Sequence, residues 1–244
     1  MSERPGQGIS PTPESSERTI VTSSPFDPAA PPPLVVAIVA YQGVLADETD
    51  VFRDVLAVLP QATVVMVGAQ IGTVAGPGGA QDVTATFDDL GRADIVVVPG
   101  GLGAHRHPEI AAWLRRIEPR FVLASSTGSA LLAASGLLEG RTAVTHWLAG
   151  PLLERHGVTV SSERMVVDLP FITCSGLASS FDAAFEVARR IGGPGLVRQV
   201  RQQLEERVAQ VTTPTPARKD QRPPRRARPQ APSDPVEVEL EPRR

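Results

Sequence analysis

One stretch near the middle of the chain, residues 121–147, constrains the fold most strongly; it reads FVLASSTGSALLAASGLLEGRTAVTHW. It begins with a short apolar run, residues 121–124, which is typical of a strand buried in a parallel sheet. Residues 127–135 are rich in Ala and Leu and favour a helix, and Gly136 stands where a left-handed C-cap would fall. Ser126 is therefore predicted to lie in a sharp strand-to-helix turn at the carboxyl edge of a sheet, where α/β proteins keep a nucleophile.

Apolar runs alternate with helical patterns over the rest of the ordered chain. Buried strands are predicted at residues 34–40, 62–68, 94–98 and 121–124, with shorter strands at 158–160, 165–167 and 171–174. Helical spacing predicts helices at residues 47–59, 107–117, 148–156, 181–191 and 196–211, and residues 72–86 suggest a small antiparallel excursion at a sheet edge. The alternation indicates an α/β fold with a doubly wound, mostly parallel sheet, a flavodoxin-like three-layer sandwich with an elbow turn.

Composition changes sharply at both ends of this region. Residues 1–33 are rich in Ser, Pro and Glu, and residues 212–244 are rich in Pro and Arg, so we expect both segments to be disordered around one domain at 34–211. The net charge of −3 argues against binding polyanions by bulk charge. A single cysteine, Cys174, excludes an internal disulfide framework. No apolar run approaches transmembrane length, so we expect a cytoplasmic protein without membrane contact.

The central stretch resembles the nucleophile elbow of the ThiJ/PfpI superfamily, whose fold is shared with class I glutamine amidotransferases. The resemblance is greatest to the N-terminal sensor domain of GlxA-type regulators of the AraC family. Their pattern of Cys-Thr-Gly-Ala, Ala-Gly-Leu-Leu-x-Gly and Thr-His-Trp is matched in order by residues 126–129, 135–140 and 145–147. Those regulators continue into helix-turn-helix motifs, for which this chain has no room, so no direct sequence-specific DNA binding is expected.

The elbow residue itself departs from the family pattern, because Ser126 stands where Cys is usual. A helix N-terminus alone gives a thiol a usable thiolate fraction, whereas a hydroxyl ionises far too weakly and needs a positioned base. We therefore expect Ser126 to be non-catalytic, although its hydroxyl remains able to bind a ligand through a hydrogen bond.

Several other residues are predicted to surround Ser126. A carboxylate after the first strand approaches the elbow in the superfamily, and Glu48 is the first choice for it, with Asp47 the alternative or a helix N-cap. Gly100 and Gly101 end another strand and offer backbone donors. Ser126, Thr127 and His146 complete the candidate ligand-binding set. If the protein is an enzyme, the candidate catalytic residues are Ser126, Glu48 and His146.

His146 is either a general base for Ser126 or a ligand-wall or structural residue. His105 and His107 are expected to lie at the pocket rim, because no cysteine or carboxylate completes a metal site with them. We therefore expect no metal and no cofactor. Cys174 lies in an apolar strand and is expected to be an inert buried thiol.

Three functions compete on this evidence. The first is a non-catalytic domain that binds a small polar ligand and regulates transcription through a partner; the second is a ThiJ/PfpI-like hydrolase or lyase using Ser126; the third is a dimerisation unit with a vestigial pocket. The unusual serine within an intact motif favours the first. A homodimer is also expected, because the superfamily commonly pairs and the last helix carries an apolar face from Leu196 to Val208, unless that face packs on its own sheet.

Overall fold

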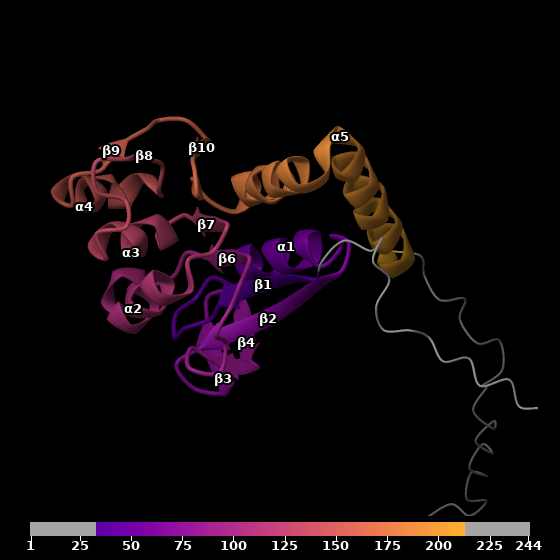
Figure 1. Ribbon diagram of the computed structural model, residues 1–244, viewed down its shortest axis with the longest axis horizontal. Helices are drawn as coiled ribbons and strands as arrows, with labels where there is room; N and C mark the ends of the chain where they lie inside the picture. Colours follow the sequence, from indigo (N-terminus) through magenta and orange to yellow (C-terminus); the bar gives the residue numbers. More distant parts are fainter. Residues whose placement is uncertain (1–32, 213–244) are drawn as a thin grey trace, which may run out of the picture. The chain divides into compact units, whose positions relative to one another are not determined.

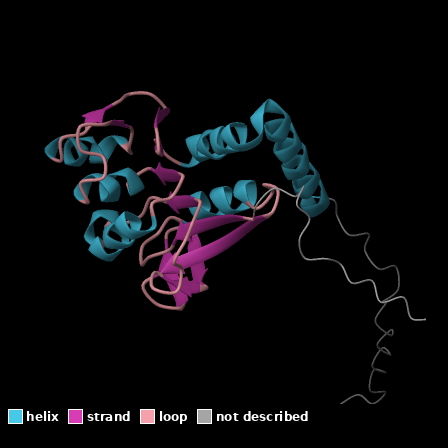
Figure 2. Ribbon diagram, viewed as in Figure 1, coloured by secondary structure: helices cyan, strands magenta, loops and turns pink. Residues whose placement is uncertain are grey.

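A seven-stranded sheet forms the centre of the protein in this computed structural model, which describes residues 33–212 (Figures 1 and 2). The strand order is β10-β11-β7-β6-β1-β2-β5, and only β10 runs antiparallel to its neighbour. The strands are β1 (Leu34–Val39), β2 (Ala62–Gly68), β5 (Ala85–Thr86), β6 (Ile95–Val98), β7 (Phe121–Ser125), β10 (Met165–Asp168) and β11 (Phe171–Cys174). The chain fills one side of β1 first and then the other, so the strand order reverses between β1 and β6, as in doubly wound sheets.

Helices and two small sheets complete the domain. The helices are α1 (Ala46–Leu56), α2 (Pro108–Ile117), α3 (Gly128–Ala134), α4 (Gly150–Arg155) and α5 (Leu177–Thr212), with 3-10 turns η1 (Ala104–Arg106) and η2 (Trp147–Ala149). The antiparallel hairpin β3 (Gly72–Gly76) and β4 (Gly79–Val83) is the predicted excursion. The pair β8 (Thr142–Ala143) and β9 (Thr159–Val160) lies beside α4.

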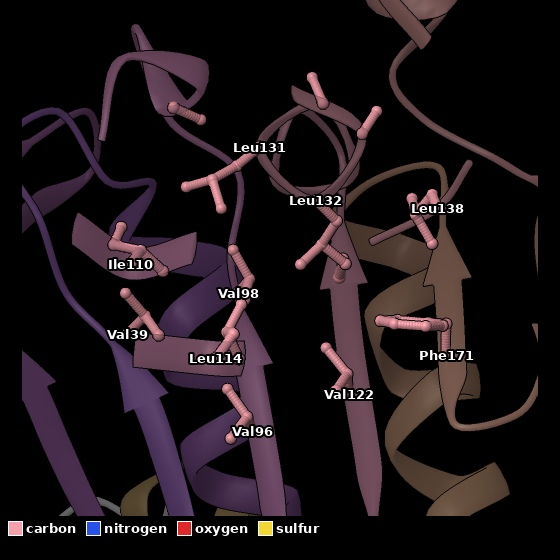
Figure 3. Close-up of a cluster of buried hydrophobic side chains, with 14 of the residues drawn as sticks. Val39, Val96, Val98, Ile110, Leu114, Val122, Leu131, Leu132, Leu138 and Phe171 are labelled. Atoms are coloured by element: carbon pink, nitrogen blue, oxygen red, sulfur yellow. The ribbon is translucent and has the colours of Figure 1, made fainter. Parts of the chain in front are cut away.

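The central sheet is buried on both faces, as its continuous apolar runs predict. On one face, Val96 and Val98 of β6 pack with α2 and α3, including Leu114 and Leu131 (Figure 3). On the other face, Ile95 and Val97 pack in a second cluster with apolar side chains of α1 and the first part of α5. Because successive strand residues point to opposite faces, these two clusters define three layers, and the predicted α/β sandwich is confirmed.

The helices predicted at residues 181–191 and 196–211 form one element, α5, and the backbone between them is non-helical at Gly192 and Gly193. The first of the two begins earlier than predicted. Ser179 and Ser180, of a residue type that commonly caps helices, precede Phe181, but α5 begins at Leu177. The hydroxyls of Ser179 and Ser180 instead donate to the Gly176 carbonyl at 2.9 and 3.2 Å, from inside the first turn. The two serine hydroxyls thus bond to a backbone carbonyl of the preceding turn, and neither serine occupies the N-cap position.

The apolar face of α5 packs within its own domain. The described residues up to Leu204 belong to one compact unit, and in it Val200 is fully buried and Leu196 is 8% exposed. Leu204 packs against the same cluster. The alternative stated for this face is therefore correct for Leu196, Val200 and Leu204, whereas Val208 is 62% exposed. Leu196 and Val200 are not available for a dimer interface.

Within residues 33–212, none of the helices combines the length and the apolar character needed to cross a membrane. The predictions made for residues 1–33 and 212–244 fall outside the described residues, apart from Pro33 and Thr212.

Candidate functional site at the β7–α3 elbow

Ser126 forms a tight, strained turn between β7 and α3. Its φ angle is +51°, in the left-handed region that non-glycine residues rarely adopt, and the residue is 5% exposed. Its N–H donates to the Cys174 carbonyl at 2.9 Å, and its own carbonyl accepts from the Thr145 hydroxyl at 2.7 Å. Bonds from two other segments thus hold the predicted elbow in its unusual conformation.

Close backbone contacts around the elbow require glycine at two positions. A Cβ added to Gly128 would lie 2.1 Å from the Val98 carbonyl oxygen, so α3 starts directly against the end of β6. A Cβ at Gly100 would lie 2.7 Å from the Ser126 Cβ. The absence of side chains at both positions is what allows the two strand ends and the helix to meet.

Glu48 on α1 lies buried beside the elbow. Its Oε2 accepts from the Gly100 N–H at 2.9 Å and from the Ser125 hydroxyl at 2.5 Å. Burial raises the pKa of the Glu48 carboxyl, and this outweighs the opposing hydrogen bonds and the nearby His146. Of the two predicted carboxylates, Asp47 is exposed with its carboxylate against Gly78 in the β3–β4 turn, so Glu48 is the one next to Ser126.

The backbone donors predicted at Gly100 and Gly101 are already in use. The Gly100 N–H binds Glu48, and the Gly101 N–H donates to Thr127 Oγ1 at 2.9 Å. The Thr127 hydroxyl in turn donates to the Gly101 carbonyl at 2.9 Å. Neither N–H therefore points unpaired at a position where an oxyanion would develop.

His146 lies near Ser126 without forming a nucleophile–base pair with it. Its Nδ1 accepts from the Leu148 N–H at 3.4 Å, so a neutral imidazole carries its proton on Nε2 and offers no lone pair there. Within residues 33–212, the Ser126 hydroxyl makes no hydrogen bond to His146 or Glu48. The arrangement lacks the hydrogen bond by which a base activates a serine.

Above the elbow lies a cavity of about 550 Å³. Ser126, Thr127, Gly101 and His146 contribute to its wall, whereas Glu48, Asp47 and Gly100 do not. Apolar side chains supply most of the rest, and the remaining polar ones are basic. The full lining consists of Leu45, Gly101, Leu102, Gly103, Ala104, His105, Ser126, Thr127, Ala130, His146, Leu148, Ala149, Leu152 and Arg155.

Sequence comparison identifies the family of this fold. Residues 35–190 match the sequence profile of the DJ-1/PfpI family. The chain belongs to the DJ-1/PfpI family. It is 35% identical over 158 residues to an isonitrile hydratase of Pseudomonas putida. The aligned region covers 62% of this chain and 69% of that protein.

Two further DJ-1/PfpI comparisons extend the picture. The chain is 30% identical over 137 residues to the HTH-type transcriptional regulator CdhR of Pseudomonas aeruginosa, covering 54% of this chain but only 41% of the regulator. Its fold matches a ThiJ/PfpI family protein from Pseudomonas syringae with a TM-score of 0.67 at 22% identity, covering 76% of this chain and 77% of that one. Similarity to both an enzyme and a regulator is thus established for this DJ-1/PfpI chain.

Several residues of this DJ-1/PfpI site were not foreseen from the sequence. Ser125, the last residue of β7, donates its hydroxyl to Glu48, and the alternation of side chains along a strand was the available signal that it points away from Ala124. Arg155 reaches the cavity from α4, which no motif indicated. His105 lines the cavity as a predicted rim residue, whereas His107 lies beside Tyr41 with ring centroids 4.8 Å apart.

Cys174 is buried next to the elbow on β11. Burial raises the pKa of its thiol to about 12, and its Sγ lies 3.8 Å from the Ser180 hydroxyl. These surroundings are those of an unreactive thiol. Among the residues that the structure describes, no group of three or more His, Cys, Asp or Glu side chains is placed to hold a metal ion.

Proposed function

We propose that this domain binds a small molecule beside Ser126 without turning it over, and that binding regulates transcription through a partner. The observation that carries the proposal is the Ser126 hydroxyl, which stands at a nucleophile's position without a base hydrogen-bonded to it. A hydroxyl requires such a base, whereas the family's usual thiol does not.

Glu48 is a poor substitute for the missing base. Among residues 33–212, the Glu48 carboxyl accepts no hydrogen bond from the Ser126 hydroxyl, so it is not placed to take that proton. Its Oε2 is also engaged by Gly100 and Ser125. A second argument against catalysis is that the Gly100 and Gly101 N–H groups already donate hydrogen bonds to Glu48 and Thr127. They are therefore not free to stabilise a developing oxyanion.

The similarity to a transcription regulator supports the regulatory part of the proposal. The chain is 30% identical to CdhR over 137 residues, and the match covers 41% of that regulator. We propose that a partner protein couples ligand binding to transcription and that the ligand has a polar group facing Ser126.

A second candidate is a ThiJ/PfpI-like hydrolase or lyase, including a hydratase, that uses Ser126, Glu48 and His146. The 35% identity to an isonitrile hydratase favours it. In this candidate a rotation of His146 away from the Leu148 N–H would free Nδ1 to accept the Ser126 proton.

Two measurements separate the candidates. Wild-type protein is incubated with an alkyl isonitrile, and the formamide that hydration would produce is followed by mass spectrometry; we expect no formation above a Ser126→Ala control. Labelling with a serine-directed fluorophosphonate is expected to leave Ser126 unmodified. Turnover that requires Ser126, or labelling that His146→Ala abolishes, would replace the binding proposal with the enzymatic one.

A further inference from the structure

The charge of the cavity wall is one-sided. Among residues 33–212, the ionisable side chains of the lining are His105, His146 and Arg155, with no Asp or Glu. The nearest carboxyl, Glu48, lies behind the wall with its Oε2 bound to Gly100 and Ser125. A ligand in this cavity therefore meets positive or neutral groups at every polar position.

Arg155 is the only lining side chain that is permanently charged. It is exposed, and its Nε donates to the Pro151 carbonyl at 3.3 Å within α4. Within residues 33–212 it forms no ion pair with a carboxylate, unlike Arg141 and Arg164, which pair with Asp168 and Asp182 at 2.8 and 3.1 Å. Its guanidinium thus retains donors for an anion from outside the chain.

Exposure differs around the cavity wall. Ser126 is 5% exposed, whereas Leu102 and Leu148 are 71% and 66% exposed, and Arg155 is exposed as well. Leu45, Ala130 and Leu152 add apolar surface to the same wall. The wall thus combines a nearly buried hydroxyl, apolar side chains and an exposed cation.

From this arrangement we infer that the ligand is an amphipathic carboxylate: a polar neutral group beside Ser126, an apolar middle, and an anionic end bound by Arg155 with His105 alongside. The inference rests on the proposed function, because it names the ligand class of the same site. The cavity volume of about 550 Å³ suits a ligand of that kind, since small-molecule pockets commonly enclose about 300–1,000 Å³.

Three probes of equal length test the charge of the bound end. Suberic acid monoamide, suberamide and 8-aminooctanamide share a carboxamide and an aliphatic chain, and their other ends are a carboxylate, a neutral amide and an ammonium. Isothermal titration calorimetry on the full chain at neutral pH is expected to show the carboxylate binding about tenfold more tightly than the amide, and the ammonium binding most weakly.

Two arginine variants then locate the anion. Arg155→Gln is expected to remove the carboxylate's advantage over the amide while leaving amide binding unchanged. Arg116→Gln is the matched control, because Arg116 is an exposed arginine of α2 outside the cavity wall, and it should preserve the advantage.

The outcomes separate this inference from the proposed function. Equal or tighter binding of the amide or ammonium probe, or an advantage that survives Arg155→Gln, overturns the amphipathic carboxylate and leaves a binding domain with another ligand class. Failure of all three probes to bind also overturns the inference. The proposed function fails on a different observation, namely turnover or serine labelling by the wild-type protein.

Discussion

At the scale of single residues, the replacement of a thiol by a hydroxyl at position 126 decides what the elbow can do. The backbone retains its left-handed turn at Ser126 and the bonds to Cys174 and Thr145 that hold it. The geometry associated with a nucleophile is therefore kept while the nucleophile itself is weak. A change of one atom tests this directly.

Ser126→Cys is expected to create a reactive, peroxide-sensitive cysteine. The new thiol would face the cavity at the start of α3, where helix N–H groups lower a thiol pKa below that of free cysteine. Stopped-flow reaction with a disulfide reagent should therefore be at least about tenfold faster than for free cysteine. The wild-type protein is the control, because its only thiol, Cys174, has a pKa raised to about 12 and should not react while folded. A new thiol no faster than free cysteine would show that the turn does not activate a nucleophile.

Glu48→Gln is expected to remove a pH dependence of stability. The folded pKa of Glu48 lies above its usual value of 4.5, so folding favours the neutral carboxyl. The contribution of Glu48 to the free energy of unfolding is then greatest below about pH 4.5 and falls as pH rises through the folded pKa. Glutamine keeps an acceptor for Gly100 and Ser125 and does not titrate. Urea unfolding at pH 5 and pH 8 should show the variant gaining stability relative to wild type at the higher pH, and a constant difference would contradict the raised pKa.

At the scale of elements, the site depends on how closely α3 approaches the end of β6. The two elements meet at Gly128 and Val98, where backbone contacts leave no room for a side chain. The packing of α2 and α3 on the sheet, which includes Ile110 and Leu132, holds α3 in this position (Figure 3). The elbow is thus a product of helix–sheet packing as well as of its own sequence.

Gly128→Ala is expected to destabilise the fold strongly. Its Cβ would lie 2.1 Å from the Val98 carbonyl oxygen, and relieving this overlap requires α3 to move, at a cost of about 3 kcal/mol in the free energy of unfolding. Gly91→Ala is the matched control, since a Cβ there meets nothing within 4 Å, and we expect a change of about 0.5 kcal/mol or less. Denaturant unfolding measures both, and equal effects of the two substitutions would show that α3 does not abut β6.

The sequence predicted these elements well where the signal was local. The apolar runs of β1, β2, β6 and β7 stand out because strands buried on both faces need continuous apolar residues. Glu48 was preferred to Asp47 through a family resemblance, and the physical reason is helix phase: adjacent residues point about 100° apart, so only one faces the sheet. Local patterns thus located both the strand ends and the elbow.

Features that depend on distant segments were missed. Nothing near Gly101 in the sequence shows that Thr127 will occupy its N–H, because the two residues meet only after β6 and β7 pair. The start of α5 was misplaced because Ser179 can cap a helix or bond back to Gly176, and the choice depends on packing. Part of the apolar character of the cavity comes from Leu102, in the loop after β6, and from Leu148 in η2, which no periodic pattern marks.

At the scale of the whole molecule, the expected homodimer stays a prediction. The face of α5 that suggested it packs on its own core, so Leu196 and Val200 cannot form the interface. Exposed Leu102, Trp147 and Leu148 are large apolar side chains beside the cavity and are better placed to be covered by a second copy.

Sedimentation equilibrium at micromolar concentration is expected to give the dimer mass. Trp147→Ala and Leu148→Ala together should shift the equilibrium toward monomer by at least about thirtyfold, since each buried apolar side chain at an interface centre contributes at least about 1 kcal/mol. Val200→Ala is unsuitable as a test because it would disrupt the core. A wild-type monomer at these concentrations would remove the dimer.

The contacts of Glu48 also bear on how the protein reaches its native state. Glu48 is separated from Gly100 by 52 residues and from Ser125 by 77. The Ser126 N–H in turn donates to the carbonyl of Cys174, which lies 174 − 126 = 48 residues later in the chain. Contacts of such sequence separation form only after long loops have closed, so they belong to the late stages of folding. A ligand of the elbow cavity would then recognise only fully folded chains and would raise their population by mass action. Ligand supply and the amount of intact protein in a cell would become linked without any catalytic step.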